Sequence, residues 1–244
     1  MSAGNGHEPH NLLELEDLHV YLGESHILQG VSFGVREGGV TALLGRNGVG
    51  KTTTLQGILG LVERRGRVSF GGEEVGGMST HRIVRLGVGY VPEEREVFSG
   101  LTVKENLRLA ERGDGPHHYA LVYELFPELE ERGGQRAGTL SGGQQQMLAV
   151  ARALLNDNRI LLVDEPTKGL APRVVAEVVE ALERAGEAMT ILLVEQNLKA
   201  ARRLARDVTV IDQGQVAYTG TVEELLDDPV LTRRHLGVAG AGGG

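Results

Sequence analysis

Cysteine is absent from the 244-residue chain, so disulfides, thiolate zinc sites and cysteine nucleophiles are excluded. Long apolar runs are absent too. Segments such as residues 40–44 and 160–163 are short, whereas a membrane helix needs about 20 apolar residues. The polar residues 1–11 lack the apolar stretch of a secretory signal. These absences fit a protein of the reducing cytoplasm, whose role at any membrane comes through a protein partner.

An excess of basic charge is also missing. The chain has 25 lysines and arginines against 33 aspartates and glutamates, for a formal net charge of −8. Binding to a nucleic-acid backbone requires a basic face. The acidic balance therefore argues against nucleic acid as a partner, and it gives no reason to expect direct binding to anionic lipid.

The domain organisation is simple. The length suits one large domain or two small ones, and neither an internal repeat nor a long linker interrupts the sequence. We expect one domain over residues 13–236, with loose tails at 1–12 and 237–244. The 36 glycines indicate many tight loops or close approaches of the backbone to a ligand.

Two kinds of strand pattern follow one another along the chain. Residues 13–20 alternate apolar and acidic side chains, as in a half-exposed strand. Similar strands are expected at 31–35 and 67–70, so the chain opens with an antiparallel section. Continuous apolar runs, typical of strands buried on both faces, stand at 40–44, 160–163, 190–194 and 208–211.

The buried strands alternate with helical stretches, which predicts a parallel α/β sheet. Residues 100–155 are mostly helical in pattern and separate the first core strand from the later ones. The predicted fold class is therefore α/β. It has a parallel core sheet, an antiparallel β subdomain and an inserted helical subdomain at about 95–155.

A glycine-rich loop follows the first buried strand and opens a helical stretch. Residues 45–52 read GRNGVGKT, which matches the P-loop pattern G-x-x-x-x-G-K-[ST] in the context that the pattern requires. Backbone N–H groups of such a loop, together with the positive end of the helix, hold phosphates. The predicted ATP-binding residues are Gly45, Arg46, Asn47, Gly48, Val49, Gly50, Lys51, Thr52 and Thr53.

Within this set, Lys51 is predicted to reach the β- and γ-phosphates and Thr52 to ligate Mg²⁺. Two carboxylates, Asp164 and Glu165, follow the apolar run 160–163, at the sheet edge where open α/β sheets bind ligands. Alone, such acids are often only helix caps. Beside a P-loop, we expect Asp164 to hold Mg²⁺ and Glu165 to act as the general base for the attacking water.

A second anion site is predicted in the helical insert. Residues 140–144 read LSGGQ and precede a helical stretch at 145–155. One γ-phosphate needs only one cradle, so a second one suggests that it closes over the nucleotide of another copy. The residues assigned to this contact with a partner subunit's ATP are Ser141, Gly142, Gly143 and Gln144.

The P-loop, LSGGQ and an apolar run ending in Asp-Glu, in this order, resemble an ABC-transporter ATPase cassette over about 13–236. The resemblance implies a RecA-like core and a head-to-tail dimer in which each ATP lies between the P-loop of one subunit and the LSGGQ of the other. It also implies integral membrane permease subunits, an extracytoplasmic substrate-binding protein and a place at the cytoplasmic face of the membrane.

Longer stretches of the sequence narrow the resemblance to one subfamily of these ATPases. YVPEEREVFSGLTVKENL (90–107), DEPTKGLAP (164–172) and ILLVEQN (191–197) resemble the ATPases of branched-chain amino-acid importers, above all the smaller of the two that such importers pair. The ATPases of urea or short-chain amide importers remain the alternative. A homodimer and a heterodimer with a related ATPase are both open. A nucleotide-gated ABC module outside transport is a further alternative, which an intact Glu165 and P-loop disfavour.

The sequence departs from the cassette pattern near the predicted site. The usual glutamine after the strand that ends at Pro92 is Glu93, which is expected to ligate Mg²⁺ and is more often found in the branched-chain type. The usual switch histidine is Gln196, an amide that can donate to the γ-phosphate but is neither acid nor base. The adenine-stacking aromatic is replaced by Leu22, with Tyr21 one residue earlier as a weak candidate against a packing role.

Overall fold

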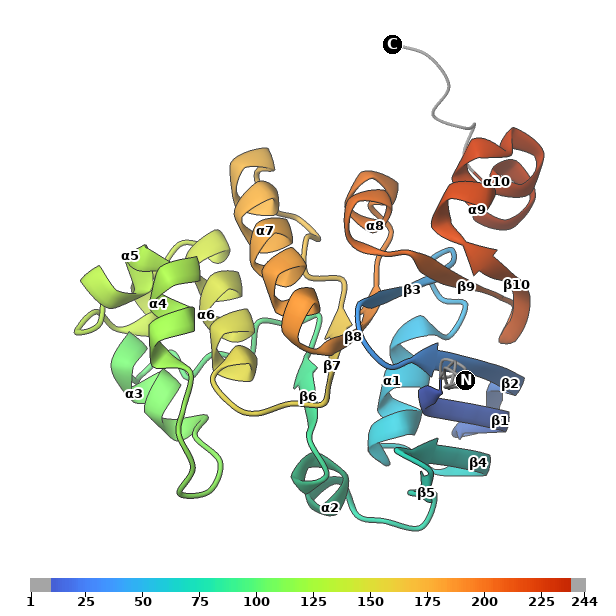
Figure 1. The fold of residues 1–244 in the computed structure, drawn as a ribbon, viewed down its shortest axis with the longest axis horizontal. Coiled ribbons are helices and arrows are strands. Elements are labelled where there is room, and N and C mark those ends of the chain that lie inside the picture. Colours follow the sequence, from blue (N-terminus) through green and yellow to red (C-terminus); the bar gives the residue numbers. More distant parts are fainter. Residues whose placement is uncertain (1–9, 238–244) are drawn as a thin grey trace, which may run out of the picture.

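A computed structural model describes residues 10–237 (Figure 1). The predicted tails lie outside the described residues except for 10–12 and 237, and of these Asn11 and Leu12 begin the first strand. Among residues 10–237, no helix is both long and apolar enough to cross a membrane.

The strands are β1 Asn11–Leu22, β2 Ser25–Arg36, β3 Val40–Leu44, β4 Arg64–Phe70, β5 Glu73–Glu74, β6 Val88–Val91, β7 Ile160–Asp164, β8 Thr190–Val194, β9 Asp207–Asp212 and β10 Gln215–Thr221. The α-helices are α1 Lys51–Leu59, α2 Thr80–Arg85, α3 Val103–Leu109, α4 Tyr119–Leu125, α5 Pro127–Glu131, α6 Gly142–Leu154, α7 Pro172–Ala188, α8 Leu198–Leu204, α9 Val222–Asp227 and α10 Pro229–Leu236.

The main sheet has six strands in the order β10-β9-β3-β8-β7-β6. The pairs among β6, β7, β8, β3 and β9 are parallel, and β10 runs antiparallel at one edge. The strands β3, β7 and β8 are buried along their whole length, as their continuous apolar sequences predict. The predicted α/β fold with a parallel core is confirmed.

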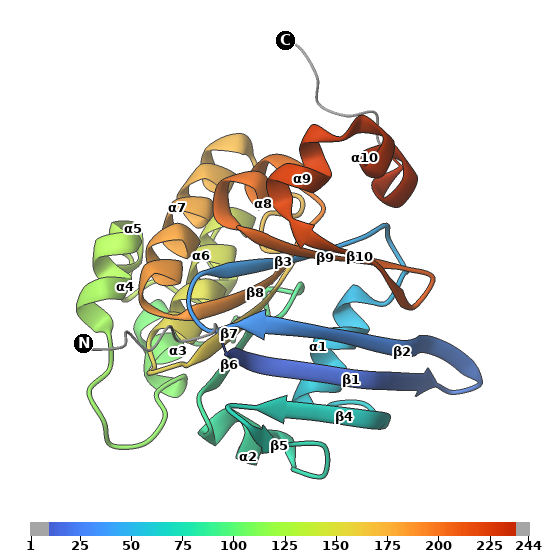
Figure 2. The same cartoon turned by 45° about the vertical axis from the view of Figure 1, so that its right-hand side comes forward.

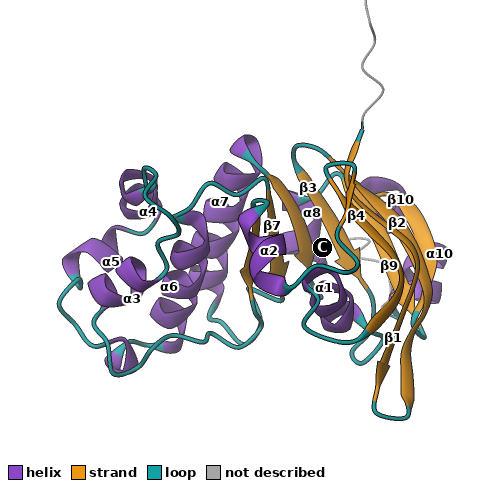
Figure 3. Ribbon diagram, turned by 90° about the horizontal axis from the view of Figure 1, so that it is seen from below, coloured by secondary structure: helices purple, strands orange, loops and turns teal. Residues whose placement is uncertain are grey.

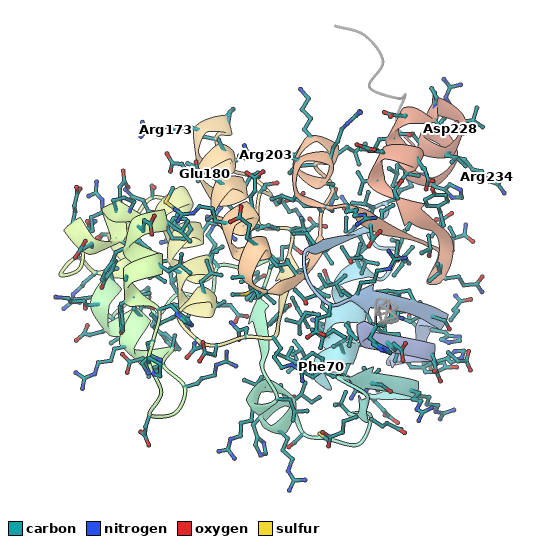
Figure 4. The ribbon with its side chains drawn as sticks, viewed as in Figure 1. Phe70, Arg173, Glu180, Arg203, Asp228 and Arg234 are labelled. Carbon is teal, nitrogen blue, oxygen red and sulfur yellow. The ribbon has the colours of Figure 1, made fainter. Side chains whose placement is uncertain are left out.

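Alternate residues of the buried strands face two different cores. Ala42 and Leu44 of β3 pack with one apolar cluster, whereas Leu43 between them packs with the other. The first cluster joins the sheet to helices α3–α10. The second joins it to α1 and to the antiparallel sheet β2-β1-β4-β5, which includes Phe70, labelled in Figure 4. Figure 2 shows the strands of this second sheet lying beside the main sheet.

The segment between β6 and β7 forms the helical block of α3, α4, α5 and α6. Figure 3, seen from below, shows this block to one side of β7, with α1 and the antiparallel sheet on the other side. Helix α6 begins at Gly142, three residues before the start expected from sequence. The earlier start follows from a capping box, in which the Ser141 hydroxyl accepts from the Gln144 N–H and the Gln144 side chain accepts from the Ser141 N–H.

Candidate ATP site

The sheet order places three functional loops side by side. Strands β3, β8 and β7 are neighbours and parallel, so their carboxyl ends lie at one edge. The P-loop follows β3, Gln196 follows β8, and Glu165 follows β7. Residues from three distant parts of the sequence therefore meet where open α/β sheets bind ligands.

The P-loop has a backbone that only glycine adopts easily. Gly45, Gly48 and Gly50 all have positive φ. A Cβ on Gly45 would lie 2.3 Å from the Ile211 carbonyl oxygen, so this position also excludes a side chain sterically. Gly50 precedes α1 and leaves the first turn of that helix without a side-chain cap. The N–H groups of this turn are therefore free to meet a phosphate.

Lys51 lies under this loop and is buried. Its Nζ donates to the carbonyl oxygens of Gly45 and Arg46, each at 3.0 Å, and lies 3.5 Å from Oε1 of Glu165. The ammonium group is thus held by two weak backbone acceptors and one carboxylate. A phosphate is a stronger, charged acceptor, so Lys51 is placed to exchange the carbonyls for a nucleotide.

Glu165 contacts three side chains of the site, those of Lys51, Gln196 and Lys168. Its Oε1 accepts a 2.5 Å hydrogen bond from Nε2 of Gln196, and its Oε2 lies 3.3 Å from Nζ of Lys168. Burial by itself would raise the pKa of Glu165, but the Gln196 hydrogen bond and the charges of Lys51 and Lys168 together hold the pKa below its ordinary value. Glu165 is therefore ionised at neutral pH, as a proton acceptor must be.

The backbone of Glu165 is also unusual. Its φ is 44°, in the left-handed region that non-glycine residues adopt at a cost of about 1–3 kcal/mol. The Glu165 N–H donates to the carbonyl of Val194, and the Glu165 carbonyl accepts from the N–H of Lys168. These bonds hold a sharp turn directly after β7, and the turn brings the carboxylate to Lys51 and Gln196.

The surroundings of the Asp164 carboxylate suit a bound cation. It is the last residue of β7 and fully buried, and within residues 10–237 neither carboxylate oxygen has a hydrogen-bond partner. Burial raises the pKa of Asp164 to about 6; the nearby Thr52 hydroxyl and Lys51 oppose the rise, while Glu165 and Glu93 add to it. Two unpaired buried carboxylate oxygens beside a phosphate loop are the hard oxygen donors that Mg²⁺ prefers.

Glu93 does not stand free beside Asp164. Its Oε1 lies 2.5 Å from Nζ of Lys168, the same ammonium group that contacts Glu165. Sequence reasoning missed Lys168. The available signal was the placement of one of only four lysines three residues after the predicted base. Lys168 offsets the extra negative charge that Glu93 brings to the site.

The four LSGGQ residues assigned to a partner do not join this group. Ser141 is exposed, and Ser141 and Gln144 bond to each other, with Gln144 also donating to Glu128. Figures 1 and 3 both show β7 between α6, which carries these residues, and α1, which carries Lys51. One chain therefore holds two separate phosphate-type helix starts.

Tyr21 is placed on the antiparallel sheet. Its ring stacks on His26 with centroids 4.2 Å apart, and the Arg65 guanidinium lies 5.8 Å from the ring centroid. Leu18 and Val20 of the same strand are buried, whereas Tyr21 is exposed. The ring thus has a packing role in β1, and stacking on adenine stays a prediction.

Comparison with known proteins agrees with this geometry. The family described as ABC transporter matches residues 28–168. A high-affinity branched-chain amino acid transport ATP-binding protein of Pseudomonas aeruginosa, BraG, is 39% identical over 93% of this chain and 100% of its own length. A probable branched-chain amino acid transport ATP-binding protein of Archaeoglobus fulgidus, LivF, is 35% identical over 88% of this chain and 94% of its own.

A solved structure of a nucleotide-free ATP-binding cassette from an ABC transporter shares the fold. It superposes with a TM-score of 0.80 at 25% identity, covering 91% of this chain and 98% of that one.

Proposed function

Because this chain belongs to the ATP-hydrolysing subunits of ABC transporters, we propose that it is one half of an ATP-sandwich dimer that powers amino-acid import. The observation that carries the sandwich is the separation of the two helix starts. The P-loop, with its buried Lys51, and the buried Glu165 form one half-site, and the exposed Ser141 lies on the other side of β7. A second cassette, placed head to tail, brings its Ser141 segment to this chain's ATP.

The proposed chemistry uses the side chains at the edge of the sheet. Backbone N–H groups of residues 45–53 and Nζ of Lys51 bind the phosphates, and Asp164, Thr52 and Glu93 would hold Mg²⁺. When bound there, Mg²⁺ would supply neutralisation of charge on the phosphate oxygens. Glu165 accepts the proton of the attacking water, and Gln196 holds the Glu165 carboxylate in place through its amide.

Glu93 links the proposed metal site to a second surface. A groove of about 300 Å³ lies between strand β6, the segment that follows it and helix α6, and its lining includes Tyr90, Glu96 and Ala153. The groove wall continues directly into the loop that carries Glu93. We assign it to a short segment of a membrane subunit, because the Glu93–Lys168–Glu165 contacts connect this loop to the site.

The cargo is proposed to be a branched-chain or other hydrophobic amino acid. The support is the branched-chain amino acid transport of the relatives BraG and LivF and the carboxylate at position 93. Import of urea or a short-chain amide is the alternative. The proposed location is the cytoplasmic face of the membrane, against permease subunits that receive substrate from an extracytoplasmic binding protein.

The test is phosphate release by the purified chain, alone and with its membrane subunits and related ATPase in vesicles loaded with ATP. We expect stimulation by the membrane subunits and uptake of labelled leucine. Uptake of urea without leucine would overturn the cargo. Ala153→Arg, which fills the groove, should leave phosphate release by the isolated chain unchanged and remove the stimulation. Full stimulation of Ala153→Arg would contradict the groove assignment.

A further inference from the structure

Glu195 is a buried carboxylate that the proposed chemistry leaves without a role. It follows β8 directly and is only 2% exposed. Its Oε1 accepts from the Thr167 hydroxyl at 2.7 Å and from the Thr167 N–H at 3.3 Å. Its Oε2 accepts from the N–H groups of Gln196 and Asn197, both at 2.9 Å. One carboxylate thus receives four hydrogen bonds, two on each oxygen.

The four bonds join the two segments that carry the reaction. Thr167 belongs to the turn after β7 that presents Glu165, and Gln196 belongs to the turn after β8. The parallel pairing of the two strands ends at Asp164 and Val194. Past that point, the Glu165 N–H to Val194 carbonyl bond, the Gln196–Glu165 bond and the Glu195 cluster tie the turns together.

We propose that Glu195 is a positioning residue for ATP hydrolysis, which locks the Thr167 turn to the Gln196 turn so that the Gln196 amide keeps Glu165 aimed at the attacking water. This inference rests on the role of Glu165 as general base proposed above. The physical reason for a carboxylate at this position is its two acceptor oxygens, each facing two donors. No neutral side chain of this size offers four acceptor positions and no donor.

A purely structural role is the competing explanation, and the two differ in what a substitution changes. Burial raises the pKa of Glu195 while its four hydrogen bonds oppose the rise, so the carboxylate is held at some cost. If the cluster only stabilised the fold, its loss would lower the folded fraction and leave the turnover of folded protein intact. If it positions Glu165, its loss lowers kcat while ATP still binds at the P-loop.

The main variant is Glu195→Gln, in which an NH₂ group replaces one oxygen and faces two N–H donors. We expect kcat to fall by about 10²-fold, the size of effect that a misplacement of 1 Å produces. The dissociation constant for a fluorescent ATP analogue should stay within twofold. Glu183→Gln is the matched control, because Glu183 is a half-exposed carboxylate of α7 whose partner is Arg203, labelled in Figure 4.

Thr167→Val and Thr167→Ser test the same cluster from the other side, so the proposal can be checked even if Glu195→Gln fails to fold. Valine removes the hydroxyl donor at nearly constant volume and should lower kcat. Serine keeps the donor, so Thr167→Ser should retain a kcat close to that of the wild type. Equal kcat in both variants would contradict the proposal. A loss of ATP binding in step with kcat would also overturn it, since that result is the signature of a structural role.

A double variant tests whether Glu195 acts on Glu165 through Gln196. In a Gln196→Ala background the link through which Glu195 acts is gone, so Glu195→Gln should lower kcat by less than it does in the wild type. Full additivity would overturn the proposal. Glu165→Gln separates this inference from its premise. If that variant turns over normally, the base assignment fails. If it is inactive while the Glu195 and Thr167 variants keep the wild-type kcat, only the positioning role fails.

Discussion

The helices α1 and α6 both begin at glycine-containing segments proposed to contact phosphate, but their first turns differ. Helix α1 begins at the buried Lys51 with no side-chain cap, and its surroundings are Glu165, Gln196 and Asp164. Helix α6 begins beside the exposed Ser141, which closes a capping box with Gln144. One helix start is open and charged, and the other is capped by its own side chains.

The difference indicates which half of the site can act alone. The α1 end holds every group proposed for phosphate, metal and proton transfer, so we expect it to bind nucleotide within one chain. The α6 end, which we propose as an anion site, is capped by its own side chains, and we expect it to contact a phosphate only when another subunit presents one. Variants at the α1 end should therefore change chemistry or affinity within a chain, and variants at the α6 end should change assembly.

The largest effect is expected at the base. Glu165→Gln keeps the shape of the side chain but cannot accept a proton, so turnover should fall by about 10²–10⁴-fold. ATP binding should persist, and the dimer should remain closed around unhydrolysed ATP. Single-turnover phosphate release and size-exclusion chromatography with ATP measure both. Undiminished turnover would rule out Glu165 as the base.

The next effect concerns affinity. Lys51→Ala removes the ammonium group that the P-loop holds beside Glu165, and Mg-ATP binding should weaken by about 10²-fold through loss of charged hydrogen bonds. Titration calorimetry gives the dissociation constant. Lys104→Ala is the control, since Lys104 is an exposed lysine of α3. Wild-type affinity in Lys51→Ala would contradict the P-loop assignment.

The α6 end is tested by Ser141→Arg. The bulky cation should spare ATP binding by the monomer but block the closed dimer, with a loss of about 10²-fold in turnover, as for removal of a transition-state donor. Light scattering with ATP reports the assembly. Mixing this variant with Lys51→Ala should restore at most one working site in a homodimer. A fully active monomer would contradict the sandwich.

A smaller effect is expected on stability. The folded-state pKa of Asp164, about 6, lies above its ordinary value of 3.8, so the folded protein binds a proton that the unfolded chain lacks, and stability falls as pH rises through this window. Asp164→Asn removes that cost and should raise the free energy of unfolding at pH 7.5 by roughly 1–3 kcal/mol. Urea unfolding without Mg²⁺ at pH 7.5 and pH 4.5 tests this, and an equal gain at both pH values would refute it.

The smallest effect is expected for Gln196→His, because an imidazole N–H can still donate to Glu165 as the Gln196 amide does. If Gln196 is matched to Glu93, then Gln196→His should leave turnover unchanged or lower it. Only the combination with Glu93→Gln, which frees Lys168 from one carboxylate, should raise it. Steady-state phosphate release by the two single variants and the double variant distinguishes these outcomes. A clear gain from Gln196→His alone would show that Gln196 limits the rate.

Sequence patterns predicted what depends on neighbours in the chain. The buried strands β3, β7 and β8 follow from continuous apolar runs, and the P-loop follows from eight consecutive residues. The contact between Glu93 and Lys168 joins residues 75 positions apart, and no periodicity encodes it. The cluster around Glu195 likewise depends on the order of β8 and β7 in the sheet.

The left-handed backbone of Glu165 has a consequence for attempts to improve this protein. Glycine and asparagine occupy that conformation with less strain than glutamate does. Either residue at position 165 would relieve the turn after β7 and remove the proton acceptor in the same step. A search for heat-resistant variants that scores folding alone would collect such changes, and it would select against catalysis at a strained residue on which we propose that hydrolysis depends.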